Sequence, residues 1–295
     1  LLRGLLDRPN LRDSLEKGLY KLINESFPQL SWLANWVEDN WLEYMDVPKG
    51  IVITKSCEWI PEGYARRAGF SCEELVKLLE AELPALQKLD LLAKGIILQI
   101  LRMMHERAAT FGKDDTYFPT WVVQIGNEPR SNIRKYSVSS YRTCEEDFIR
   151  ALDKQASLYT EHQPLLEKAR AKAIKQGAQH SSRLFRKLAK EIGLVVPPKG
   201  GHMRFTLNED LVKFLVVSII EPGKKMLLSD FLKEMYKRYG FIIGPDELEG
   251  KNLGISTGDL DRNRNSFQEM LKQCGFLRDL SDATSILENP FGGLL

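Results

Sequence analysis

The sequence is poor in cysteine, histidine and net charge. Its 295 residues include four cysteines and four histidines, and 42 basic residues nearly balance 40 acidic ones. The cysteines lie far apart without a CxxC pair, so neither a disulfide framework nor a zinc knuckle is expected. The histidines have no metal-ligand spacing, and a net charge of +2 does not by itself indicate a polyanionic ligand. We therefore expect reduced thiols, no metal and no cofactor.

Long apolar runs and catalytic motifs are also missing. The longest apolar stretches, near residues 91–101 and 211–220, are too short to span a bilayer, and no signal peptide is visible. The sequence contains no phosphate-binding loop, HExxH, GxSxG or dinucleotide fingerprint. Residues 245–251 resemble the PD…ExK pattern of metal nucleases, but here the carboxylates share one short loop instead of lying on separate strands. We predict a cytoplasmic protein without membrane contact that is not an enzyme and has no catalytic residues.

The hydrophobic periodicity predicts a mostly α fold with small β hairpins, arranged as a helical N-terminal domain followed by one or two winged-helix units. Residues 1–165 are expected to form a mixed, mainly helical domain, with a long helix at 83–109, a strand at 116–124 and an exposed loop at 126–140. Residues 166–207 are expected to form a basic helix and a hairpin. Residues 208–295 are expected to form a C-terminal domain.

The second of these ranges is the one strongly polarised stretch. Ten basic residues and a single acid, Glu191, lie between Lys168 and Arg204. Ser181 or Ser182 is expected to cap a helix with Phe185 on its apolar face and a glycine stop at Gly193. A hairpin then follows at 194–207. Four cations on the opposite helix face and two in the hairpin are candidate phosphate contacts: Arg183, Arg186, Lys187, Lys190, Lys199 and Arg204.

The C-terminal range repeats the order of helix, glycine and hairpin. Asn208 is expected to cap a nearly all-apolar helix, and Ser229 to cap a second helix after a short strand. A third helix at 259–274 and two strands, at 276–280 and 285–288, complete the range. The spacing from Phe267 to Gly275 equals that from Phe185 to Gly193.

Through residues 185–207 and 208–291 the chain resembles the winged-helix DNA-binding superfamily. Residues 226–244 are also similar to segments of accessory proteins from bacterial anti-phage defence operons. The superfamily resemblance implies a third helix in the major groove and a wing on the DNA backbone. It assigns six residues to these positions: Arg262, Asn263, Arg264, Asn265, Gln268 and Arg278. Four nearby acids depart from a strongly basic DNA face: Asp259, Asp261, Asp279 and Asp282.

Three functional hypotheses follow. Arginine and asparagine can read base edges, so the leading hypothesis is a DNA-binding subunit of a multi-protein bacterial system such as anti-phage defence. Its partners would be double-stranded DNA and other protein subunits. The alternative is a protein-interaction module whose winged helices bind protein, since an acidic partner would use the basic stripe equally well. The third is a nuclease subunit.

Overall fold

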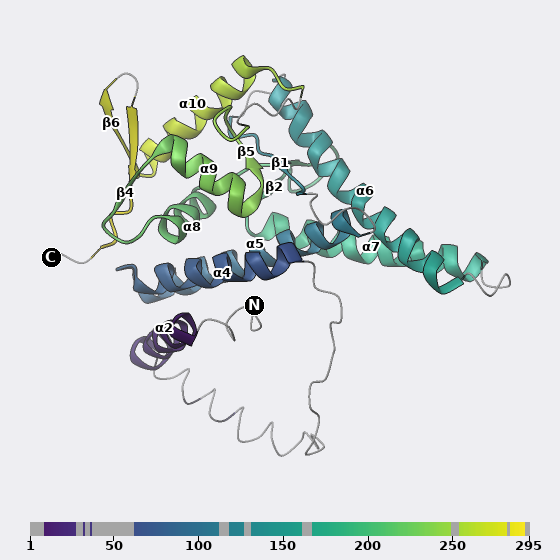
Figure 1. Ribbon diagram of the computed structural model, residues 1–295, viewed down its shortest axis with the longest axis horizontal. Coiled ribbons are helices and arrows are strands. Elements are labelled where there is room, and N and C mark those ends of the chain that lie inside the picture. The colour runs from purple at the N-terminus through teal and green to yellow at the C-terminus, as the bar shows by residue number, and fades with distance from the viewer. Residues whose placement is uncertain are drawn as a thin grey trace.

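The computed structural model describes residues 9–27, 32, 36, 62–111, 118–126, 131–160, 167–248, 254–281 and 284–292. The chain is mostly helical with small β-sheets, as the sequence predicted (Figure 1). No helix in these ranges is both long enough and apolar enough to cross a membrane.

The described residues of the N-terminal range form helices and one short strand. Its elements are α2 (Pro9–Tyr20), the π-helical turn η1 (Lys21–Glu25), α4 (Glu62–Glu80), α5 (Ala85–Thr110), β1 (Trp121–Val122) and α6 (Asn132–Thr160). The long helix predicted at 83–109 is confirmed as α5. Of the strand predicted at 116–124, residues 116 and 117 lie outside the described residues, and the described part contains the two-residue strand β1.

The exposed loop predicted at 126–140 is wrong from Asn132 onward, because α6 begins there. Ser131 starts the helix, since its hydroxyl oxygen accepts the backbone N–H of Arg134 at 3.2 Å. The buried positions that follow are spaced four residues apart, at Ile133, Ser137 and Tyr141. The many polar residues of this segment therefore occupy the outer face of a helix.

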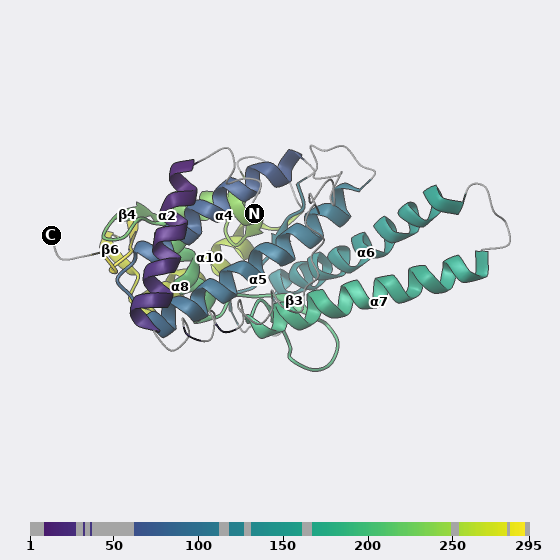
Figure 2. The same cartoon turned by 90° about the horizontal axis from the view of Figure 1, so that it is seen from below.

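The basic range forms α7 (Glu167–Glu191) and a hairpin of β2 (Val195–Val196) and β3 (Arg204–Phe205). The hairpin is confirmed, but the helix begins well before the predicted cap at Ser181 or Ser182. Helices α6 and α7 run side by side as an arm that projects from the body (Figure 2). At its base, the rings of Phe148 and Phe185 lie 5.5 Å apart.

The C-terminal range follows the predicted order of helix, strand, two helices and hairpin. Its elements are α8 (Glu209–Ile219), β4 (Lys225–Leu227), α9 (Leu228–Tyr239), β5 (Phe241–Ile242), α10 (Thr257–Gln273), β6 (Leu277–Ser281) and β7 (Thr284–Glu288). Strand β7 lies between β4 and β6 and is antiparallel to both. The Asn208 cap is confirmed by a 2.9 Å hydrogen bond from the Leu211 N–H. The Ser229 cap is wrong, because α9 already begins at Leu228 without a side-chain cap.

One hydrophobic core joins the three ranges. Strand β1 pairs in parallel with β5, with Trp121 opposite Phe241, and the Trp121 ring stacks on Phe205 of the hairpin at 4.6 Å. Helices α4 and α5 also pack on α8.

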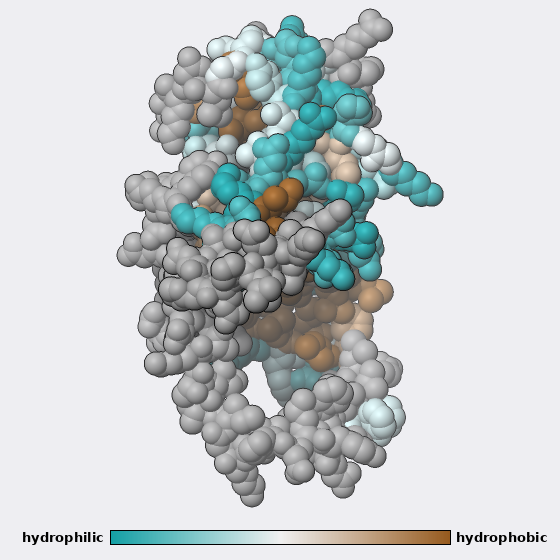
Figure 3. All heavy atoms as spheres, turned by 90° about the vertical axis from the view of Figure 1, so that its right-hand side faces the viewer, coloured by the Kyte–Doolittle hydropathy of each residue, from teal (hydrophilic) through white to brown (hydrophobic). Residues whose placement is uncertain are grey.

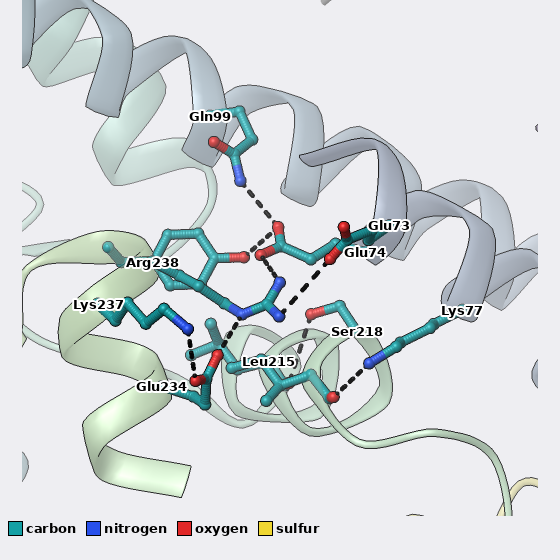
Figure 4. A network of polar contacts seen from close by, with 11 residues as sticks. Glu73, Glu74, Lys77, Gln99, Leu215, Ser218, Glu234, Lys237 and Arg238 are labelled. Carbon is teal, nitrogen blue, oxygen red and sulfur yellow. Dashed lines mark hydrogen bonds and ion pairs between the residues drawn. The ribbon is translucent and has the colours of Figure 1, made fainter. Parts of the chain in front are cut away.

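A buried polar network fixes α4 and α5 to α9 (Figure 4). The Glu74 carboxylate accepts hydrogen bonds from Gln99 at 2.8 Å, from Arg238 at 3.0 Å and from Tyr239 at 2.6 Å. Glu234 accepts from Arg238 on the other side, at 3.0 Å. Glu73 lies within ion-pair distance as well, at 3.9 Å, so three carboxylates surround the buried guanidinium of Arg238, as a buried charge requires.

Candidate nucleic-acid interface

Exposed cations run from the end of α7 onto the β2–β3 hairpin. Arg183 and Lys187 are exposed one helical turn apart, and Lys199 is exposed in the hairpin loop. Lys190 links helix and loop, because its Nζ donates a 2.8 Å hydrogen bond to the Pro198 carbonyl oxygen. We call Arg183, Lys187, Lys190 and Lys199 the α7–hairpin surface.

Arg186 was expected in the same exposed stripe, but it turns toward α6. Its guanidinium donates to Glu145 Oε1 at 2.7 Å and is partly buried. The hydrogen bond to Glu145, followed by one to Tyr141, raises the pKa of Arg186. This arginine therefore ties α7 to α6, and the stripe loses one of its four predicted helical cations.

Arg204 was also expected in the exposed stripe, and the structure places it in the interior. The residue is only 9% exposed, and its Nε is buried without a hydrogen-bond partner. Throughout the described part of the chain, no carboxylate forms an ion pair with it. Burial, and then the positive charge of Arg134, lower the pKa of Arg204. Arg238, by contrast, is buried beside three carboxylate partners.

The cations predicted as base readers around α10 are mostly ion-paired. Arg262 pairs with Asp259, and Arg264 pairs with Asp246 at 3.1 Å and with Asp261 at 3.2 Å. Two further readers also have partners within the domain: Gln268 donates to the Ser285 hydroxyl, and Arg278 pairs with Glu288. Asn265 is exposed. Two of the four acids that departed from a basic DNA face, Asp259 and Asp261, therefore neutralise the arginines beside them.

Asn263 was expected on the exposed face of the third helix, but it is buried. Its amide donates to the carbonyl oxygens of Val123 and Ile243, both at 2.8 Å, and its Oδ1 accepts the Ile125 N–H at 3.0 Å. The assignment of Asn263 as a base reader is therefore wrong, because all its hydrogen-bonding groups are used in the core. The sequence pattern indicates this burial, because position 263 lies at helical spacing between Leu260 and Phe267, which are both buried.

Residues 245–251, which resemble a nuclease motif, are described as far as Leu248, and there Glu247 has a structural role. Glu247 accepts the backbone N–H groups of Ile243 and Gly244 at 2.9–3.1 Å, and burial raises its pKa to about 7. Glu249 and Lys251 lie outside the described residues. Among the residues that the structure describes, no group of three or more histidine, cysteine or acidic side chains is arranged to hold a metal ion.

Hydrophilic side chains dominate much of the described surface on the side of the arm. Figure 3 shows them in the upper half of the view, at the height where α10 and the beginning of α6 lie in Figure 1.

Comparison of the chain with protein-family models, curated proteins and solved structures found no match. Any function of this chain must therefore be inferred from the geometry of the chain itself.

Proposed function

We propose that this chain is a DNA-binding subunit of a multi-protein bacterial system, such as an anti-phage defence system, and that it acts in the cytoplasm. It contacts double-stranded DNA through the α7–hairpin surface, and other subunits are its protein partners. The proposal rests on the exposure of Arg183, Lys187 and Lys199 and on their lack of acidic partners. All three are exposed, and no described acid pairs with them. Such cations are available to phosphates.

The placement of the surface supports duplex contact. It lies at the base of the arm, where α7 ends (Figure 2), and continues onto a hairpin that the Trp121–Phe205 stack fixes to the core. The arrangement of the C-terminal range, with β7 between β4 and β6, agrees with the order of elements in the winged-helix resemblance. The ion pairs of α10 nevertheless favour the α7–hairpin surface over α10 as the main phosphate contact.

Charge reversal tests this proposal. The double variant R183E/K187E should bind a random-sequence duplex more weakly in fluorescence anisotropy at two or more salt concentrations. Each lost phosphate contact lowers the salt slope of log K by about 0.9, so two contacts lower it by about 1.8. The matched control is K17E/K224E, which makes the same change in net charge at exposed lysines outside this surface. Equal affinity and equal slope for all three proteins would contradict the proposal.

A protein-interaction module is the second candidate, and a groove favours it. The groove has a volume of about 300 Å³ and lies between α5, α6 and α7. Its lining is mostly apolar and includes Met104, Phe111, Phe148 and Leu152. This candidate takes precedence if R183E/K187E leaves duplex binding unchanged. For the third candidate, a nuclease subunit, no specific observation among the described residues argues, since they hold no group of three or more histidine, cysteine or acidic side chains arranged for a metal ion.

A further inference from the structure

The groove between α5, α6 and α7 lies where the two helices of the arm leave the body (Figure 2). Its volume of about 300 Å³ is at the lower end of the range for small-molecule sites, and spaces between packed helices are common places for such sites. Two of its lining residues, Ala108 and Phe148, are buried, and the Phe148 ring packs against Phe185 at 5.5 Å. The groove is therefore large enough for a small organic molecule, and its deepest part is fixed by the core.

The lining of this groove is apolar except at two positions. Arg107 is exposed and is the one charged residue among the lining residues that the structure describes, and Ser181 adds a hydroxyl group. An apolar molecule that covers the rest of the lining gains free energy, because apolar surface is removed from water. The other six described lining residues are all apolar: Met104, Ala108, Phe111, Phe148, Ala151 and Leu152.

The charge at the groove is positive. No acid is among the described residues that line it. Asp147 lies one helical turn before Ala151, but its carboxylate is buried, lies 3.1 Å from His105 Nε2 and forms an ion pair with Arg150. The guanidinium of Arg107 therefore determines which ligand charge is favourable. Its planar fork can donate two parallel hydrogen bonds to a carboxylate, whereas it repels a cation.

We propose that this groove is a binding site for a small anionic amphiphile, a molecule with an apolar chain and one carboxylate. The apolar chain covers Met104, Phe148 and Leu152, and the carboxylate accepts hydrogen bonds from Arg107. Because the lining comes from α5 as well as from α6 and α7, the bound molecule joins the arm to the body. The site does not depend on the proposed DNA-binding function, and its occupant differs from the partner side chains of the second candidate.

Straight-chain carboxylates are the probes. Butanoate, hexanoate and octanoate are titrated into the full chain in calorimetry, with 1-octanol and octylammonium as the uncharged and the cationic counterparts of octanoate. Affinity should rise about fourfold for each methylene group that the groove covers. Octanoate should bind about tenfold or more tightly than 1-octanol, because a carboxylate pairs with the guanidinium, and octylammonium should bind most weakly. Octanoate should also raise the temperature of thermal unfolding.

Substitutions separate the cation from the apolar lining. Arg107→Gln should weaken octanoate binding about tenfold or more and leave 1-octanol binding unchanged. The matched control, Arg142→Gln, removes the charge of an exposed arginine of α6 that does not line the groove, and it should bind octanoate as the native chain does. Ala151→Phe places a ring in the groove and should weaken the binding of both ligands, with circular dichroism to verify its fold. If that variant does not fold, the comparison of Arg107→Gln with Arg142→Gln decides.

Three results would overturn the proposal. If the native chain binds none of the carboxylates, the groove is left to the side chains of a protein partner. If octanoate, 1-octanol and octylammonium bind equally, or if Arg107→Gln retains the native affinity for octanoate, the groove does not select a carboxylate. If a folded Ala151→Phe variant binds octanoate as the native chain does, the ligand binds elsewhere. None of these results bears on duplex binding by the α7–hairpin surface, which R183E/K187E tests separately.

Discussion

Replacement of Gly95 by alanine tests whether the N-terminal and C-terminal ranges form one body. Gly95 lies in α5 and faces the ring of Phe214 in α8. A Cβ atom at this position would lie 2.3 Å from Phe214 Cε2 and 2.6 Å from its Cζ. These distances are far below van der Waals contact, and Phe214 is itself buried in the shared core. The substitution therefore forces the two helices or the ring to move.

Two opposing effects set the magnitude. Alanine in place of glycine within a helix stabilises by roughly 0.5–1 kcal/mol. Overpacking of a filled core costs about 1–3 kcal/mol. The steric effect prevails at 2.3 Å, so Gly95→Ala should lower the free energy of unfolding by about 1–2 kcal/mol. For a chain of this length, that corresponds to a fall in Tm of roughly 2–4 °C.

Gly177→Ala provides the matched control within another long helix. Its Cβ would meet Leu152 at 3.6 Å, an ordinary contact, so only the helix-propensity gain should remain. Scanning calorimetry or circular dichroism of both variants at the same pH measures the difference. If Gly95→Ala matched the native chain or gained stability as Gly177→Ala does, the packing of α5 on α8 described above would be refuted.

Three further predictions concern buried groups. The free energy of unfolding of Glu247→Gln should rise relative to that of the native chain as pH increases from about 4.5 to 8, by at most about 3 kcal/mol. Urea unfolding at several pH values measures this difference. The pKa of Glu247 is about 7 in the folded chain and lies above the value in the unfolded chain, so the native chain loses stability as pH rises through this window. The glutamine variant has no carboxyl group at this position and does not. Parallel pH profiles of the two proteins would contradict the reasoning. Asn263→Ala should lower the free energy of unfolding by about 3 kcal/mol or more, because three backbone groups lose their buried hydrogen-bond partner. A loss under about 1 kcal/mol in thermal unfolding would show that water replaces the amide. Leu215→Asp should abolish cooperative unfolding of the full chain in calorimetry, since Leu215 is fully buried in apolar surroundings, and a native-like transition would show that its helix is misplaced.

Features that depend on neighbouring residues in the sequence could be predicted. Asn208 caps α8, and Gly193 and Gly275 adopt positive φ angles of 76° and 78° where their helices were expected to stop. The two hairpins follow these glycines as predicted. Each of these features is fixed by a local requirement, either for a hydrogen-bond acceptor at a helix start or for a left-handed backbone.

Features that depend on distant residues could not be predicted in the same way. Asn263 is held by backbone groups of Val123 and Ile125, about 140 positions away. Arg204 is buried because α6 packs on β3, and the sequence gives no direct indication of that contact. A basic stretch indicates where cations lie along the chain, but the tertiary packing decides which of them remain on the surface.

Local spacing explains part of this division among the predicted cations. Arg262 and Arg264 each follow an aspartate by three residues, and both pair with it on the helix surface. Arg183 and Lys187 follow no acid at three or four residues, and both remain exposed without an acidic partner among the described residues. The rule fails for Arg186, which also lacks a preceding acid but reaches Glu145 across the arm. The absence of a local acid is therefore not sufficient to leave a cation without an acidic partner. The structure supplies the second condition by showing which of these cations also have no distant acid. Arg183, Lys187 and Lys199 meet both conditions at the surface, and Arg204 meets them in the interior.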